Sequence, residues 1–310
     1  DPEACYLGFE VCYSTDKGVE FIKDAFEFLT EESEAAFPHI MASLKSKMGA
    51  SSLFEPQLMK RVFEYTLFNE GEHSVFEAAR KGHLRVIKYL MEGFNVNSFG
   101  EFPICWASEH GHLHIVKYLV EKGISQSFKE RAIPWACKLG RLDIVKFLVE
   151  ENNLDVNVDD GISIEAACEM GHLEVVKFLV QRGASPNGAS GDGILVWLSA
   201  REGHIKTLKF LVEEANADLR RQGTASLWHA CKKGKAEIAE YFLSKGIDVH
   251  SGDDAAICWA SYGGHLEIVK MLVARGASVR AQGSYPARIA KERNHTETFQ
   301  YLLENGARYY

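Results

Sequence analysis

Apolar and polar positions recur along most of the chain with a period of about thirty residues. In the segment "GHLHIVKYLVEKG", which begins at Gly111, the apolar residues are Leu113, Ile115, Val116, Tyr118, Leu119 and Val120. This spacing predicts a helix that is buried over most of its girth, with Lys117 on the remaining strip. A second short apolar segment, "PICWASEH", precedes the glycine and carries a pair of small residues. The pattern therefore predicts two helices for each period.

Related segments begin at Gly82, Gly111, Gly140, Gly171, Gly203, Gly234, Gly264 and Asn294. Successive starts lie 29 to 32 residues apart. Eight copies at a nearly constant period predict a solenoid. A residue in the left-handed conformation ends a helix at low cost when it is Gly or, next best, Asn. We therefore expect this residue to end the first helix of each pair.

The best-kept copy is "AACEMGHLEVVKFLVQRGA", from Ala166 to Ala184. It resembles the ankyrin repeat, a helix–turn–helix unit with a projecting turn. The resemblance covers about residues 71–310 and implies an all-α ankyrin-repeat solenoid of about eight repeats. The Thr-Pro-Leu-His of the family is absent. The period is also shorter than the family's roughly 33 residues, so we expect shorter projecting turns.

Residues 1–70 lack the repeat and hold 13 acidic against 6 basic residues. Amphipathic stretches there predict three helices. We therefore expect an acidic helical region over residues 1–70 and the repeat array over residues 71–310. A solenoid must shield the open face of its first repeat, so a helical cap is one interpretation. A separate recruitment module, such as an F-box-like domain, is the other.

Composition narrows the classes of function. The chain has 310 residues, of which 46% are hydrophobic, and a net charge of −8. This acidic balance does not indicate a nucleic-acid partner. No run of 18 apolar residues predicts a membrane span. Seven cysteines, mostly in repeat columns, favour reduced thiols and a cytoplasmic protein, although the start at Asp1 leaves a cleaved targeting segment open.

Three histidines within five residues, His110, His112 and His114, raise the question of a metal site. His112 belongs to a column that recurs in most repeats, which favours a packing role. Gly111 interrupts the helix that would bring His110 and His114 onto one face. We therefore expect no metal, no cofactor and no small-molecule substrate. No H-E-x-x-H or G-x-S-x-G motif is present, so we also expect no catalysis.

Two further columns favour structural roles. All five tryptophans lie in the predicted first helices, and we expect them to pack in the core rather than to stack on a ligand. The second helices carry a lysine column, which we expect to be a solvated strip paired in part with acidic residues three positions earlier. Its members are Lys88, Lys117, Lys146, Lys177, Lys209 and Lys270.

The resemblance also implies a binding surface. In ankyrin arrays the two residues after the small pair face a concave groove. Here these positions hold seven cations and four anions, with the apolar Leu139 and Met170 at the centre. Two aromatic residues in the turns are further contact candidates. The predicted partner-binding residues are Arg80, Lys81, His110, Lys138, Leu139, Met170, Arg201, Lys232, Lys233, Tyr262, Phe99 and Phe128.

These features predict a non-catalytic scaffold that binds a partner protein through the concave face and the turns of the array. The partner segment is expected to be both acidic and apolar, which would complement the groove. Two alternatives stay open. The array could be a structural spacer in a larger assembly. It could also be the substrate receptor of an adaptor whose recruitment module is the F-box-like N-terminal region.

Overall fold

A computed structural model of the protein describes residues 74–92 and 95–309. The predicted acidic helical region of residues 1–70 lies outside the described residues. Within them, helices follow one another through short turns and no β-strand occurs, so the all-α prediction is confirmed.

The helices alternate between a first and a second helix of each pair. The first helices are α6 (Ser74–Lys81), α8 (Phe102–His110), α10 (Gln126–Lys138), α12 (Ile162–Met170), α14 (Ile194–Glu202), α16 (Leu219–Lys233), α18 (Ser251–Gly263) and α20 (Ala281–Glu292). The second helices are α7 (Leu84–Leu90), α9 (Leu113–Glu121), α11 (Leu142–Lys146), α13 (Leu173–Gln181), α15 (Ile205–Lys209), α17 (Ala236–Ser244), α19 (Leu266–Ala274) and α21 (Thr296–Glu304). Short 3₁₀ turns are η2 (Val96–Phe99) and η4 (Val158–Gly161), and single π-helical turns are η3 (Phe147–Glu151) and η5 (Phe210–Glu214).

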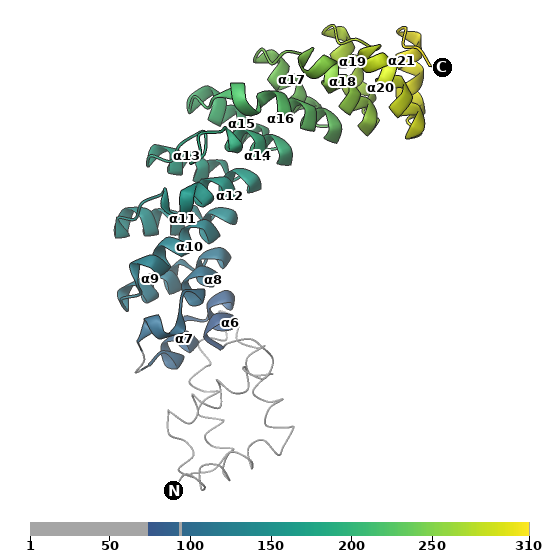
Figure 1. Ribbon diagram of the computed structural model, residues 1–310. Helices are drawn as coiled ribbons and strands as arrows, with labels where there is room; N and C mark the ends of the chain where they lie inside the picture. The colour runs from purple at the N-terminus through teal and green to yellow at the C-terminus, as the bar shows by residue number, and fades with distance from the viewer. Residues whose placement is uncertain (1–73, 93–94, 310) are drawn as a thin grey trace, which may run out of the picture. The chain divides into compact units, whose positions relative to one another are not determined.

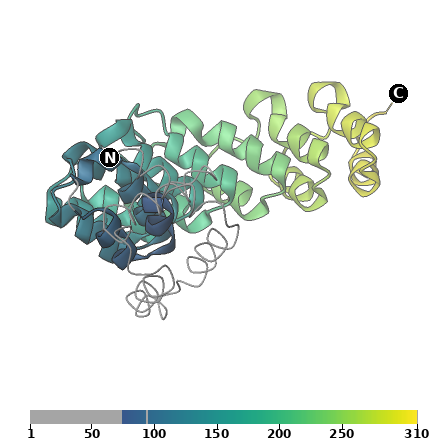
Figure 2. The same cartoon turned by 90° about the horizontal axis from the view of Figure 1, so that it is seen from below.

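The pairs belong to two compact units. The first unit includes the chain up to Ala136 together with Asp143–Asn153, and the second includes Cys137–Leu142 and Leu154–Tyr310. In the second unit the first helices α12, α14, α16, α18 and α20 pack side by side in chain order (Figures 1 and 2). The second helices form a parallel layer behind them. In the first unit α6 packs against α8, and each of them packs against its own second helix.

The core of each pair lies between its two helices. On α9, Ile115, Val116 and Leu119 have no solvent exposure, whereas Tyr118 and Val120 are half-buried. The helix therefore buries one broad face rather than most of its girth. Burial of each such aliphatic side chain contributes about 1.5–3 kcal/mol, and the same three positions are buried on α13 and α19. Each pair therefore supplies its own share of the core of its unit.

The repeat glycines end the first helices as the sequence predicts. The φ angles at these seven glycines lie between 67° and 95°, and Asn294 takes the same conformation with a φ of 61°. In five of the pairs after the first, a histidine follows the repeat glycine or Asn294 and reaches back to the preceding pair. Its Nε2 donates a hydrogen bond to the carbonyl oxygen two residues before that pair's glycine. These bonds are His112–Arg80 (2.9 Å), His172–Lys138 (3.0 Å), His204–Glu169 (2.9 Å), His265–Lys232 (3.0 Å) and His295–Tyr262 (3.2 Å).

The same histidine rings explain why no side chain fits at Gly82, Gly140, Gly171, Gly234 and Gly264. A Cβ at Gly171 would lie 2.3 Å from Nδ1 of His204, and one at Gly264 would lie 2.3 Å from Nδ1 of His295. Both distances are far shorter than van der Waals contact. The glycine therefore meets two demands at once, because it provides the positive φ and leaves room for the next pair's histidine.

Two second helices contain one extra residue, and the structure absorbs it in a π-helical turn. After α13, the left-handed residue Gly183 follows Lys177 by six positions. After α11 and α15 the left-handed residue is an asparagine, Asn153 or Asn216, and it follows the equivalent lysine by seven positions. A π turn is the usual accommodation of a single inserted residue in a helix. The turns η3 and η5 stand at these two places.

The lysine column is only partly the solvated strip that the sequence predicts. Lys177 and Lys270 pair with Glu174 and Glu267, at 3.1 and 2.9 Å. Most members also lie over an aromatic ring of the next second helix within the same unit. These contacts are Lys88 over Tyr118 (5.4 Å), Lys117 over Phe147 (5.3 Å), Lys177 over Phe210 (6.0 Å) and Lys209 over Tyr241 (5.9 Å). The column thus helps to join neighbouring repeats.

The glycine–histidine contact can be tested with two alanine substitutions. Gly171→Ala and Gly183→Ala add the same methyl group at residues with φ angles of 75° and 98°. At Gly183 no atom lies within 4 Å of the new Cβ, so only backbone strain of about 1–2 kcal/mol is expected. At Gly171 the methyl also overlaps His204, which should cost a further ~1–3 kcal/mol. Chemical unfolding followed by circular dichroism measures both losses.

The double variant Gly171→Ala/His204→Ala is the control, because it removes the ring that the methyl meets. The steric part of the loss at Gly171 should be recovered in this background, apart from the cost of the missing histidine bond measured in His204→Ala alone. Equal losses for Gly171→Ala and Gly183→Ala would contradict the close contact.

Candidate functional site

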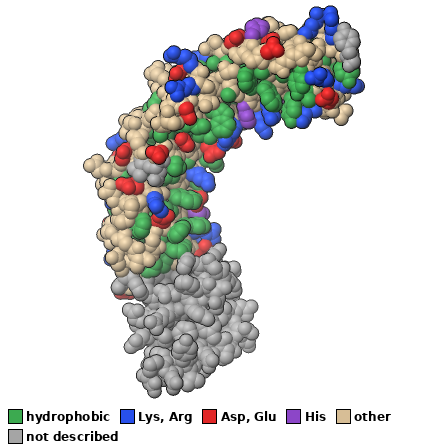
Figure 3. Space-filling model, viewed as in Figure 1, with side chains coloured by type: hydrophobic (Ala, Val, Ile, Leu, Met, Phe, Trp, Pro, Cys, Tyr) green, Lys and Arg blue, Asp and Glu red, His purple; other side chains and the backbone are tan. Residues whose placement is uncertain are grey.

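Large apolar side chains are exposed on the first helices. Trp106 on α8 is 37% exposed and Trp135 on α10 is 42% exposed. The prediction that the tryptophans pack in the core is therefore wrong for these two. Trp197, Trp228 and Trp259 are half-buried at the surface of the second unit. In Figure 3, hydrophobic side chains gather along the first-helix side of that unit, with lysine and arginine side chains among them.

The size of the indole explains this correction. Leu198 and Ile289 occupy the same column of the repeat as Trp106 and Trp135, and they are only 8% and 7% exposed. The column therefore lies at the margin of the core, where a branched aliphatic side chain is just covered. A larger bicyclic ring extends beyond that margin and presents one face to solvent.

Cations cover several of the half-buried rings in the second unit. The guanidinium of Arg201 lies 4.6 Å from the centroid of Trp197. Nζ of Lys232 lies 4.7 Å from the centroid of Trp259 and 5.2 Å from that of Tyr262. Tyr262 is also covered by Arg293, at 3.5 Å, and its hydroxyl accepts a hydrogen bond from that guanidinium. Such contacts hold long side chains in place at a surface.

Several of the predicted groove cations are already paired within the protein. Arg80 and Lys81 both form ion pairs with the buried Glu77. The hydrogen bond from Arg80 holds the pKa of Glu77 below its ordinary value, against burial, which raises it. Arg201 pairs with Glu169 and Glu202, and the bond to Glu202 is the main cause of a raised pKa at Arg201. Little of the charge on these cations is available to a partner.

Lys232 and Lys233 differ from these paired cations. No carboxylate in the described part of the chain lies within ion-pair distance of either ammonium. Their neighbour His229 reports the local potential. Burial lowers the pKa of His229 most, and the positive charges of Lys233, Lys232, Lys235 and Arg201 lower it further. Positive charge is therefore concentrated at the end of α16.

The other predicted contact residues differ in their exposure. Met170 is 44% exposed, whereas Leu139 is only half-buried rather than fully exposed as expected. Phe99 at the end of η2 and Phe128 in α10 are both half-buried, so the short turns tuck these rings partly inward. His110 stacks on Trp106 at 6.0 Å, and its Nδ1 donates to the Trp106 carbonyl oxygen at 3.1 Å.

Two shallow pockets, which share Trp259, lie on the first-helix side of the second unit. The first pocket has a volume of about 200 Å³ and the second about 230 Å³. The first pocket is lined by Trp197, Ala225, Trp228, His229, Lys232 and Trp259. The second pocket is lined by Ala255, Cys258, Trp259, Tyr262, Gln282 and Tyr285. Both are predominantly aromatic, and Lys232 stands at the boundary between them, since its ammonium lies over two rings of the second.

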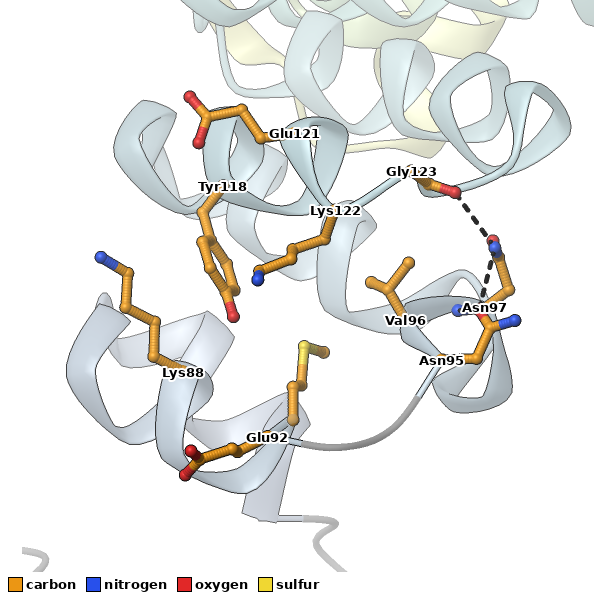
Figure 4. A pocket seen from close by; sticks show the side chains of 10 residues that line it. Lys88, Glu92, Asn95, Val96, Asn97, Tyr118, Glu121, Lys122 and Gly123 are labelled. Atoms are coloured by element: carbon orange, nitrogen blue, oxygen red, sulfur yellow. Dashed lines mark hydrogen bonds between the residues drawn. The ribbon is translucent and has the colours of Figure 1, made fainter.

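The first unit has a larger open pocket of about 1030 Å³ between α7, η2 and α9. Figure 4 shows Lys88, Tyr118 and Lys122 along one part of its wall, and the bond from Asn97 to the Gly123 carbonyl oxygen (3.1 Å) along another. Glu92 and Glu121 also line it, so its charges balance. This pocket therefore shows no preference for a cation or an anion, and we assign no ligand to it.

The described residues contain no cluster suited to metal or thiol chemistry. No group of three or more His, Cys, Asp and Glu side chains in residues 74–92 and 95–309 could hold a metal ion. Nε2 of His112 donates to the Arg80 carbonyl oxygen at 2.9 Å, and Nε2 of His114 donates to the Gly82 carbonyl oxygen at 3.1 Å. All five described cysteines are buried and free. Burial raises the pKa of Cys105 to about 12, so this thiol stays protonated.

The residue pattern alone did not single out most residues that line the two pockets. The three tryptophans among them nevertheless carry a sequence signal, because each stands three or four residues before a predicted groove residue on the same helix. Trp197 precedes Arg201 and Trp228 precedes Lys232 by four, and Trp259 precedes Tyr262 by three. Side chains at these spacings lie on one helical face.

Comparison with protein families identifies the repeat. Residues 75–160, 125–190 and 164–253 each match the family described as "Ankyrin repeats (3 copies)", and residues 252–284 match "Ankyrin repeat". The chain belongs to the ankyrin-repeat family. Ankyrin repeats are generally non-catalytic modules that bind other proteins, so this array is a protein-interaction domain.

The human protein "Ankyrin repeat and KH domain-containing protein 1" is similar to part of this ankyrin chain. The two are 38% identical over 66 residues, which are 21% of this chain and 3% of the human protein. The match thus spans a very small part of that relative. Within the described residues, no ankyrin helix combines the length and apolarity needed to cross a membrane.

The positive potential at the end of α16 of this ankyrin array can be measured at His229. Replacing Lys232 and Lys233 together by Gln should raise the pKa of His229 toward its ordinary value. The recovery should be partial, because burial is the larger cause of the shift. Titration of the His229 ring protons by NMR measures it.

Lys245→Gln serves as the control, since Lys245 pairs with Glu213 on the second-helix side at 2.9 Å and should not affect His229. The lowered pKa of His229 also determines how the free energy of unfolding depends on pH. With its folded-state pKa lowered, His229 costs stability only as pH falls below its unfolded pKa. If the pKa of His229 stayed unchanged when both lysines were replaced, this electrostatic account would be contradicted.

Proposed function

We propose that this ankyrin array is a non-catalytic scaffold that binds a segment of a partner protein on its first-helix side. The exposed face of the first helices carries the binding residues, with Met170 as an apolar contact and Lys232 and Lys233 as the cations. The partner segment is acidic and apolar. We place this activity in the cytoplasm, because five of the seven cysteines follow repeat columns rather than a disulfide framework.

One observation carries the proposal. Large aromatic and apolar side chains are exposed on the first helices of both units, where water contact is unfavourable and no second layer of helices covers them. Trp106, Trp135 and Met170 are each more than a third exposed. Binding sites are enriched in such tryptophans and methionines, surrounded by polar residues.

The other predicted contacts have smaller roles in this proposal. Leu139 in the second unit, and His110, Phe99 and Phe128 in the first, are half-buried, and each can add contact area on its own unit. Three predicted cations hold neighbouring carboxylates, namely Arg80, Lys81 and Arg201. The backbone carbonyl oxygens of Lys138 and Tyr262 accept hydrogen bonds from the histidines of the next pair. The alternatives of a structural spacer and of an adaptor with an F-box-like N-terminal module remain, and the second depends on residues outside the described part of the chain.

The scaffold proposal can be tested by selecting peptides from a random display library on the immobilised full chain. Met170→Ala should weaken the selected peptides about 5- to 30-fold, which corresponds to about 1–2 kcal/mol for an interface anchor. Leu303→Ala is the matched control, because Leu303 is 38% exposed on the second helix α21. Peptides that bind Met170→Ala as well as the wild type, yet lose affinity for Leu303→Ala, would move the binding site to the second helices.

The cations should act mainly on the association rate. Changing Lys232 and Lys233 together to Glu should slow association of acidic peptides several-fold, and raised salt should reduce the difference. Stopped-flow fluorescence measures the rate. The charge-matched control is Lys209→Glu/Lys245→Glu on the second helices, which should change the rate little. If the control slowed association as much, net charge rather than this surface would govern the encounter.

A further inference from the structure

The two pockets of the second unit together define what kind of segment would bind there. Both are built mainly from aromatic side chains, and they share Trp259. Each has a volume of 200 Å³ or slightly more. An apolar cavity of about 150 Å³ accommodates a benzene molecule. Each pocket is therefore large enough for one aromatic side chain, which would meet the rings of the wall edge-to-face or offset-stacked.

We propose that the two pockets bind two aromatic side chains of one extended partner segment, and that Lys232 binds a carboxylate carried between those two aromatics. This inference rests on the proposed function, since it specifies the partner segment for the same first-helix side. It assigns a specific pattern, aromatic–acidic–acidic–aromatic, to a segment otherwise described only as acidic and apolar.

The spacing of the pattern follows from helix packing. The first pocket is lined mostly by α16 and the second by α18 and α20, and Trp259 on α18 forms a wall of both, so about one helix separates them. Packed helices lie about 8–10 Å apart. A segment in the extended polyproline-II conformation advances about 3.1 Å per residue with three residues per turn, so two aromatic side chains three residues apart lie on the same face and span ~9 Å. Two residues then lie between them, next to Lys232.

The charge of these intervening residues follows from the cations already present. Lys232 and Lys233 have no carboxylate partner in the described part of the chain, whereas Glu202 is engaged by Arg201. Asp254, at the start of α18, is bonded to His250 at 2.9 Å. A cationic segment is disfavoured, because the rings of Trp259 and Tyr262 already lie under Lys232. Carboxylates are the groups that complement this site.

Single-stranded nucleic acid also combines stacking rings with negative charge, but it fits less well. Proteins that bind it offer a positively charged groove that follows the backbone over several nucleotides. Here the charge of Arg201 is offset by Glu169 and Glu202, and Lys232 and Lys233 are adjacent at the end of α16 rather than spread along a groove. A protein segment with one or two carboxylates suits this local charge better.

The experiment uses the full chain and three fluorescein-labelled 12-residue peptides with identical Gly-Ser flanks. Their central residues are Phe-Glu-Glu-Phe, Phe-Lys-Lys-Phe and Glu-Phe-Phe-Glu. Fluorescence anisotropy at two salt concentrations gives each Kd. The first peptide should bind at least tenfold more tightly than the second. The third, in which the aromatics are adjacent and cannot reach both pockets, should bind several-fold more weakly than the first. Labelled oligo(dT) of eight nucleotides is the nucleic-acid arm.

Two protein variants assign the binding to the pockets. Trp259→Ala removes the shared wall and should weaken Phe-Glu-Glu-Phe about tenfold, while Tyr309→Ala, at an exposed aromatic residue outside the first helices, should not. If Trp259→Ala fails to fold, Lys232→Met tests the same site at the surface. It should abolish the preference for Glu over Lys between the aromatics, whereas Lys245→Met should preserve it.

Several results would overturn the inference. The first is that Phe-Glu-Glu-Phe does not bind up to millimolar concentration. The second is that Phe-Lys-Lys-Phe binds equally well. The third is that oligo(dT) binds more tightly than the peptide and that Lys232→Met weakens its binding. Failure here is distinguishable from failure of the scaffold proposal. If the affinity of display-selected peptides still depends on Met170 while Phe-Glu-Glu-Phe does not bind, only the two-pocket inference is contradicted.

Discussion

The stacking of neighbouring pairs depends on the hydrogen bond that joins a column histidine to the end of the preceding first helix, which occurs five times among the described residues. The ring can reach the carbonyl oxygen only because the repeat glycine has no Cβ, and the glycine is also needed for its positive φ. Two columns of the sequence are therefore constrained together. Where Lys235 stands in place of histidine, its ammonium occupies the same space, 2.8 Å from a Cβ at Gly203. The contact sets how one pair stacks on the next.

This contact also links the fold to the interaction surface. The carbonyl oxygens that accept the histidine bonds belong to the residues that the groove pattern predicts as partner contacts, for example Lys138, Lys232 and Tyr262. The backbone at these positions is held by the neighbouring pair, so each side chain leaves the first helix from a fixed point. A surface built in this way loses little backbone entropy when a partner binds. The packing of the repeat and the display of contact residues share one set of bonds.

The periodic part of the fold could be predicted from the sequence, because the same columns recur with each pair. The helix pairs, the left-handed glycines and the replacement at Asn294 all follow from that repetition. The predictions that were wrong concern how deeply side chains are buried and which charged side chains pair. A column does not show whether an indole such as Trp135 is enclosed, since this depends on ring size at the margin of the core. Nor does it show that Arg201 pairs with Glu169 of the preceding repeat, which is 32 residues away.

Pairing of the groove cations changes what the surface can recognise. A row of free lysines and arginines would attract any acidic segment with little preference for its sequence. In the second unit, Arg201 and Arg293 are instead held against rings, Trp197 and Tyr262, so their long side chains are ordered before a partner arrives. The ammonium of Lys232 is held over aromatic rings in the same way but lacks a carboxylate partner among the described residues. In the binding proposed above, selectivity comes from the positioned charge of Lys232 between two aromatic pockets, because the charge of Arg201 is already offset by Glu169 and Glu202.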